Sequence, residues 1–163
     1  MNKSLTNVAR GIVCLMGVAV IIVLVILLPE LAREEAVGKV NPPAAYPFLI
    51  GAWILSLPIF IALQQTLKLL NQIDENKAFS NQSVITLRKI KYSVIAFAAL
   101  IVTGAISVIM IARSADPRED VTPVISIGFV FTFVSSLVAT FVAVLQRLLQ
   151  EAINMKKEND LTV

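Results

Sequence analysis

The chain has 163 residues, of which 57% are hydrophobic, against roughly 45–50% in soluble domains. Its net charge of +3 comes from 14 Lys and Arg against 11 Asp and Glu, and in so apolar a chain this excess indicates membrane orientation instead of nucleic-acid binding. With no histidine and a single cysteine, Cys14, the usual zinc and haem ligand sets and an internal disulfide are excluded, so we expect no metal or cofactor.

Four hydrophobic stretches are each long enough to cross the hydrocarbon core of a bilayer, which is about 30 Å thick and needs about 20 helical residues. None of the four contains a charged side chain, so each should insert as an α-helix. The first is longer than the core of a signal peptide and is expected to be a retained anchor. The predicted fold is therefore an all-α, polytopic four-helix bundle, with spans at residues 11–28, 44–63, 92–112 and 121–145.

Lys and Arg are distributed unequally among the segments that flank these spans. Ten of them precede the first span, separate the second from the third, or follow the fourth, whereas four lie in the two remaining loops. Because cytoplasmic segments carry more Lys and Arg, both termini and the middle loop are predicted to be cytoplasmic. The spans leave no room for a separate soluble domain, so we expect one transmembrane domain over residues 1–163.

The second and fourth helices are predicted to continue beyond the bilayer as amphipathic cytoplasmic extensions. After the second span, apolar residues from Leu63 to Ile73 recur on one helical face, and after the fourth span the same periodicity runs from Leu145 to Met155. Such faces favour pairing with each other or with a partner. The apolar positions are Leu63, Leu67, Leu70 and Ile73 in the first extension, and Leu145, Leu148, Leu149, Ala152 and Met155 in the second.

The third helix is predicted to begin after Ser80, a residue type that commonly caps helix N-termini. Phe79 and Val84 have the spacing of a hydrophobic staple across this start. A basic group follows at the expected height of the lipid headgroups, where it sets orientation or, alternatively, recognises anionic lipid or a protein. The basic residues are Arg88, Lys89 and Lys91.

A faint repeat relates the two halves of the chain, with an offset of 82 to 83 residues. It predicts two helical hairpins, 1–80 and 81–163, related by an axis along the membrane normal, although chance similarity between amphipathic helix ends accounts for it equally well. The ends of the two cytoplasmic extensions are the most exposed segments, and we interpret them as a candidate partner-binding surface. Its residues are Glu75, Asn76, Phe79, Glu158, Asn159, Asp160 and Leu161.

The chain lacks the residue patterns of catalysis and of ion-coupled transport. It has no His-Glu-x-x-His, Gly-x-Ser-x-Gly or phosphate-binding glycine motif, and no charged residue within the apolar cores, so we expect no enzymatic activity. Small and hydroxyl residues instead recur every fourth position on the fourth helix, a pattern typical of close helix packing. A water-filled pore is the alternative. These residues are Gly128, Thr132, Ser136 and Thr140.

Two segments resemble a known family. The stretch LKLLNQIDENKAFSNQSVITLRKIKY, the terminal ENDLTV and four spans of this length are similar to the uncharacterised bacterial family called domain of unknown function 2975. The resemblance implies a small protein of the bacterial plasma membrane, often encoded beside a small helix-turn-helix regulator. No catalytic residues are assigned in that family.

Two functions from different classes follow as hypotheses. The first is a non-enzymatic interaction or signalling module that partners a cytoplasmic helix-turn-helix transcriptional regulator and contacts no nucleic acid itself. The second is a small transporter, channel or toxin-immunity protein that acts within the bilayer. The sequence leaves open whether the chain forms a homo-oligomer.

Overall fold

The computed structural model of the chain describes residues 3–30, 45–75, 77–115, 117–118 and 120–161. Within these ranges the structure is helical and contains no strand. Four helices in the described ranges have the length and the apolar composition needed to cross a membrane. This confirms the prediction of an all-α chain with four candidate spans. The elements are α1 (Lys3–Ile22), the π-helical segment η1 (Val23–Leu27) that continues it, α3 (Ala45–Asp74), α4 (Asn81–Ala115) and α5 (Thr122–Leu161).

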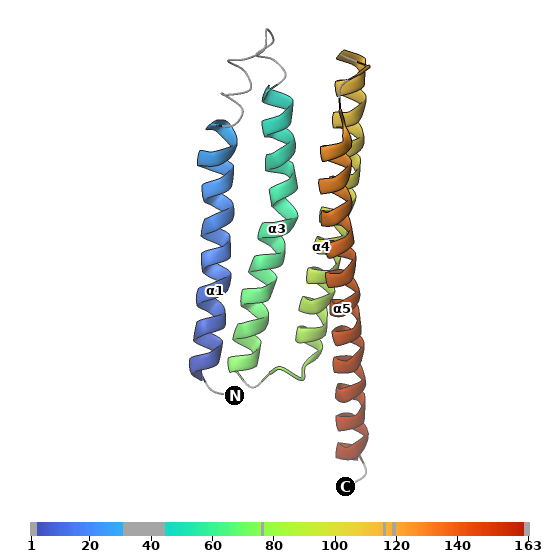
Figure 1. Cartoon of the computed structure of the whole chain (residues 1–163). Helices are drawn as coiled ribbons and strands as arrows, with labels where there is room; N and C mark the ends of the chain where they lie inside the picture. The colour runs from blue at the N-terminus through green and yellow to red at the C-terminus, as the bar shows by residue number, and fades with distance from the viewer. Residues whose placement is uncertain (1–2, 31–44, 76, 116, 119, 162–163) are drawn as a thin grey trace.

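α1, α3 and the α4–α5 pair stand side by side, with α4 partly behind α5 in this view (Figure 1). α1 packs against α3, α3 against α4, and α4 against α5, with the α4–α5 contact the most extensive. α1 and α5 lie on opposite sides of the assembly, so the described helices form an open row instead of a closed four-helix bundle. The single domain over residues 1–163 and the equivalence of the halves 1–80 and 81–163 stay predictions.

The outer surface of the row is strongly apolar. In the most apolar window of each helix only 0% to 11% of the residues are buried by the protein itself. Leu15 and Phe129, for example, are 69% and 70% exposed. An apolar surface of this extent on a soluble monomer would be unusual, and lipid is the solvent that covers it without cost.

The second and fourth helices continue far beyond the predicted spans, as expected. α3 runs to Asp74 and α5 to Leu161, past the predicted ends at residues 63 and 145. At 1.5 Å per residue α5 is about 60 Å long, twice the thickness of a hydrocarbon core. Its C-terminal part passes the ends of the other helices (Figure 1). We call the end that holds the start of α1, the α3–α4 turn and the end of α5 the terminal end.

The extension of α3 has the predicted amphipathic character, but it is not a free protrusion. Its apolar positions are half-buried, because α3 lies between α1 and α4. A Cβ atom built on Gly17 of α1 would lie 3.8 Å from Leu63 Cδ1, which shows how closely the two helices approach. At the terminal end, the Arg10 guanidinium forms an ion pair with Asp74. The half-buried residues are Leu63, Leu67, Leu70 and Ile73, and the exposed ones are Gln64, Lys68, Asn71 and Glu75.

The contact between α4 and α5 follows a 3.5-residue repeat. Along α5 the buried and half-buried positions alternate in steps of three and four, the spacing of a left-handed helix pair. A Cβ atom on Gly128 would lie 3.5 Å from Ala105 Cβ, so the two helices approach closely there. We call these positions the α5 seam: Gly128, Thr132, Ser135, Ala139, Val142, Gln146, Leu149 and Ile153.

The buried apolar cluster lies toward the terminal end. Leu87, Ile90 and Val142 are buried together, and side chains from α3, α4 and α5 pack against them. Most of these residues lie outside the predicted spans. In lipid an apolar side chain gains little by contacting another helix, whereas in water it gains by burial, so a core is expected near the ends of the predicted spans. The packing residues are Leu69, Val94 and Leu149.

The turn between α3 and α4 is held by side-chain hydrogen bonds. Ser80 caps α4 as predicted, since its Oγ accepts a hydrogen bond from the Ser83 backbone N–H at 3.3 Å. The Ser83 hydroxyl is 3.0 Å from Gln72 Oε1, to which it donates, and Gln72 Nε2 donates to Thr86 Oγ1 at 3.4 Å. All three side chains of this Gln72 cluster (Gln72, Ser83 and Thr86) are buried, and Ser83 is 0% exposed.

The first prediction concerns the Gln72 cluster. Gln72→Met keeps the length of the side chain and removes both hydrogen bonds, so the free energy of unfolding should fall by about 1–3 kcal/mol. Gln64→Met makes the same change on the exposed face of α3 and should stay within about 0.5 kcal/mol. Denaturation by sodium dodecyl sulfate in mixed micelles measures both. Equal transition midpoints for the two variants would contradict a stabilising role.

Candidate functional site

The predicted partner-binding residues lie at two places, both at the terminal end (Figure 1). Glu75 and Phe79 belong to the α3–α4 turn, while Glu158 and Asn159 belong to the last turns of α5. α5 carries its residues past the level of the turn, so the structure brings the two groups to one end without merging them into one cluster. Asn76 lies outside the described residues, as do the side chains of Asp160 and Leu161.

The α3–α4 turn exposes one aromatic side chain. Phe79 is 65% exposed although Val84, its predicted staple partner, is buried, so the staple does not cover the ring. Beside it, Lys77 Nζ forms an exposed ion pair with Glu75 Oε2 at 2.8 Å. Exposed pairs of this kind contribute at most about 1 kcal/mol. The turn therefore presents an accessible apolar ring next to charged groups, a suitable arrangement for a protein contact.

The C-terminal part of α5 is a second exposed surface. Among the side chains that the structure describes, Ile153 is the last buried one, and those of residues 154–159 are all exposed. Leu148 and Met155, seven residues apart on one helical face, are also exposed, with Met155 at 63%. Hydrogen bonds between residues four apart, such as Arg147 to Glu151 at 3.2 Å, stabilise this segment as a helix. We call residues 154–161 the α5 overhang.

Several polar contacts were not foreseen from the sequence. The pair of Arg10 and Asp74 is partly buried, and Arg10 Nε is buried without a hydrogen-bond partner. Both residues lie in the polar segments outside the apolar runs. Charged side chains in such segments are normally solvated, so the sequence did not indicate that Arg10 and Asp74 form a pair. Gln72 offered a weak signal, as a polar residue between apolar positions. Further buried atoms without a partner are Thr6 Oγ1, Gln65 Oε1 and Gln146 Oε1.

The predicted packing stripe divides in two. Gly128 and Thr132 lie on the α5 seam, whereas Ser136 and Thr140 are exposed, and Ser135 occupies the buried position instead. The Ser136 and Thr140 hydroxyls donate to carbonyls of their own helix at 2.8 Å. A step of four residues advances about 40° beyond a full helical turn, so three such steps leave the seam. A packing role for Ser136 and Thr140 stays a prediction.

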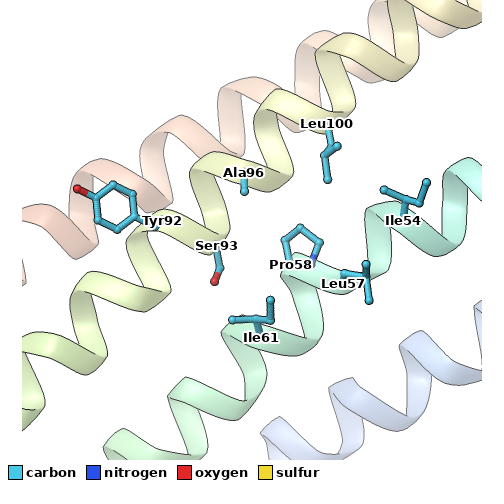
Figure 2. Close-up of a pocket in the computed structure, with 8 residues that line it drawn as sticks. All are labelled: Ile54, Leu57, Pro58, Ile61, Tyr92, Ser93, Ala96 and Leu100. Carbon is cyan, nitrogen blue, oxygen red and sulfur yellow. The ribbon is translucent and has the colours of Figure 1, made fainter.

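A shallow groove of about 390 Å³ runs between α3 and α4 (Figure 2). Pro58 of α3 lies at its centre, opposite Ser93 and Ala96 of α4. The Ser93 hydroxyl donates to the Lys89 carbonyl at 3.0 Å, so the surface is almost entirely apolar. We call this the α3–α4 groove; its residues are Ile54, Leu57, Pro58, Ile61, Tyr92, Ser93, Ala96 and Leu100.

The described residues contain no group of three or more His, Cys, Asp or Glu side chains that could hold a metal ion. Cys14 is free and exposed on the outer face of α1. Asp120 is also exposed, and hydrogen bonds from Thr122, including its backbone N–H at 3.0 Å, hold the pKa of this carboxyl below its usual value. Because one of these bonds satisfies the first backbone N–H of α5, Asp120 stabilises the start of the helix.

The fold and the apolar surface define a polytopic α-helical membrane protein. Residues 30–163 match the family described as "Protein of unknown function (DUF2975)", and the chain belongs to this family, as the resemblance of its sequence predicts. Over 166 residues it is 36% identical to the "Uncharacterized membrane protein YoaS" of Bacillus subtilis (strain 168), and the alignment covers all of both chains. No solved structure matches it.

The second prediction locates the packing surface of α5. Ser135→Leu places a large side chain on the α5 seam, where Ser135 is 6% exposed, and should cost about 1–3 kcal/mol by forcing α4 and α5 apart. Ser136→Leu, one position along, should change stability by less than about 0.5 kcal/mol. Thermal unfolding in detergent and size-exclusion chromatography test both variants. If Ser136→Leu lowers the oligomer size or the melting temperature and Ser135→Leu does not, the predicted stripe through Ser136 contacts a second copy of the chain.

Proposed function

We propose that the protein is a non-enzymatic membrane interaction and signalling module that binds a cytoplasmic helix-turn-helix transcriptional regulator at its terminal end. The main observation in support is the α5 overhang. Here α5 extends beyond the predicted span, and every described side chain from residue 154 to 159 is exposed. A helix of this length beyond the spans serves no membrane-crossing purpose. It suits recognition by another protein instead.

The proposal requires the terminal end to face the cytoplasm of the bacterium. Ten of the 14 Lys and Arg flank the spans on that side, and cytoplasmic flanks are the ones enriched in these residues. Three of the basic residues, Arg88, Lys89 and Lys91, lie in the first turns of α4 near the α3–α4 turn. The multi-pass topology then has both termini inside, and the Phe79 turn and the α5 overhang are available to soluble proteins.

The contact surface has an apolar centre and a charged rim. Phe79 supplies an exposed aromatic ring, and Leu148 with Met155 forms an apolar stripe on α5. Aromatic residues and Met are enriched at the centres of protein interfaces, whereas charged residues occupy the rims. The rim contains charges of both signs, with Glu75 paired with Lys77 in the turn, and Lys156, Lys157 and Glu158 exposed on the α5 overhang. The resemblance to proteins encoded beside helix-turn-helix regulators supports this class of partner.

A signal can reach this surface because α5 is continuous. The same 40-residue helix contacts α4 inside the apolar region and ends in the α5 overhang. A change in lipid or in a membrane partner that shifts α5 against α4 therefore moves the overhang as a rigid extension. The intramembrane hydroxyls support this reading over a pore, since Thr103 and Ser107, like Ser136 and Thr140, donate to carbonyls of their own helices.

The third prediction tests the orientation of the chain in the membrane by comparing the accessibility of the two ends of α4. In a Cys14→Ala background, Asn81→Cys and Ser114→Cys place single thiols at exposed positions near either end of the same helix. In intact cells a membrane-impermeant thiol reagent should label the Ser114 variant and leave the Asn81 variant unlabelled until lysis. Labelling of the Asn81 variant before lysis would reverse the topology.

The fourth prediction tests the partner surface. Protein in lipid nanodiscs is presented with purified helix-turn-helix regulators of the source bacterium, beginning with any encoded beside its gene. Phe79→Ala and deletion of residues 158–163 should each weaken binding at least tenfold, as truncation of central interface residues commonly does.

The control for the partner experiment is Phe129→Ala, because Phe129 is equally exposed but lies in a predicted span, and it should bind like the wild type. If no regulator binds the wild type, or if all three variants bind equally well, the proposed function is wrong. Flux of a solute through proteoliposomes would instead favour a transporter or channel.

A further inference from the structure

We propose that the α3–α4 groove is a binding site for an anionic phospholipid, with one acyl chain along the groove and the phosphate between Lys68 of α3 and Lys89 of α4. The site is independent of any regulator and of which side of the membrane the terminal end faces. It follows from the shape of the groove, from the register of the two helices and from the charges at one end of it.

The groove has the length and surface of an acyl-chain site. From Ile61 to Ile54 it spans seven residues of helix, about 10 Å at 1.5 Å per residue, which is most of a leaflet about 15 Å thick. It exists because Ala96 has a short side chain opposite Pro58, so α3 and α4 do not fill the space between them (Figure 2). Ile54 and Leu57 remain exposed at its edge, inside a predicted span, where lipid is the surrounding solvent.

The register of α3 and α4 places one lysine from each helix beyond the same end of the groove. Lys68 follows Ile61 by seven residues, two helical turns, and therefore lies on the groove face of α3. Lys89 precedes Ser93 by four residues and lies on the groove face of α4. Since the helices are antiparallel, both displacements lead toward the terminal end, by about 10 Å and 6 Å. Both side chains are exposed, at the height expected of lipid headgroups.

The charges favour an anionic headgroup. α4 contains no acidic residue, and the acidic residues at the end of α3 are paired, Asp74 with Arg10 and Glu75 with Lys77. These acidic groups therefore do not neutralise the positive charges of Lys68 and Lys89. Each lysine close to an anionic lipid surface contributes about fivefold to binding. Tyr92, at the same end of the groove, adds an exposed phenol of the kind common at membrane interfaces (Figure 2).

A second groove shows that apolar shape alone does not define the site. Between α1 and α3 a groove of about 330 Å³ has the same apolar character, formed in part by Val20, Val23 and Ser56. Neither groove has a basic residue in its lining, and at the terminal end of α1 the guanidinium of Arg10 is already paired with Asp74. We expect it to hold any lipid chain without preference. The lysines make the α3–α4 groove selective for anionic lipid over zwitterionic lipid.

The experiment uses the single tryptophan as a reporter. Trp53 is exposed and precedes Ile54 of the groove. The full chain is reconstituted in phosphatidylcholine vesicles that contain an equal fraction of phosphatidylglycerol, with bromine on the chains of one lipid or the other. Bromine quenches tryptophan on contact, so quenching should show an association constant about 25-fold higher for phosphatidylglycerol, because two lysines near the headgroup contribute about fivefold each.

Matched variants separate the site from general surface charge. Lys68→Gln with Lys89→Gln should abolish the preference, whereas Lys156→Gln with Lys157→Gln removes as much charge from the α5 overhang and should keep it. Ala96→Phe fills the groove and should also abolish it, while Val102→Phe, which lies off the groove lining, should not. Equal quenching by both lipids in the wild type, equal loss in both lysine pairs, or shielding of Trp53 from both lipids by a second copy would overturn the proposal.

Discussion

The change of solvent along each helix determines how the structure is held together. Within the bilayer an apolar side chain gains little from leaving lipid, and there the four helices form an open row with apolar outer faces. Where the predicted spans end, apolar side chains would meet water, and there Leu87 and Ile90, just outside the third span, are buried together with Val142 near the end of the fourth. Stability is therefore concentrated at the terminal end, where the Gln72 cluster also closes the α3–α4 turn.

Local signals predicted the elements of this fold well. The long uncharged runs predicted the four helices, and Ser80 predicted the start of α4. The periodicity from Leu63 to Ile73 predicted the half-buried face of α3. Each of these depends on residues close together in the chain. The open row was not predicted, because the apolar exterior that suits lipid also suits burial in a closed bundle, and periodicity alone does not distinguish them.

The contacts between helices were predicted less well, because they depend on register. The four-residue repeat identified Gly128 and Thr132 on the α5 seam, but the seam follows a 3.5-residue repeat and continues through Ser135. The ion pair of Arg10 and Asp74 joins residues 64 positions apart. The α3–α4 groove arises where Pro58 and Ala96 come opposite each other, which only the packed structure reveals.

The same two helices, α3 and α4, form the α3–α4 groove and are connected by the turn that exposes Phe79. Lys68 lies one helical turn before Gln72 on α3, and Lys89 lies three residues after Thr86 on α4. A phosphate that bridges the two lysines therefore holds together the helix ends that the Gln72 cluster also holds. Lipid binding and closure of the turn then stabilise each other, because each favours the same arrangement of α3 and α4. Because Phe79 lies in the same turn, the proposed lipid site and the proposed regulator surface share the α3–α4 turn as a common structural element.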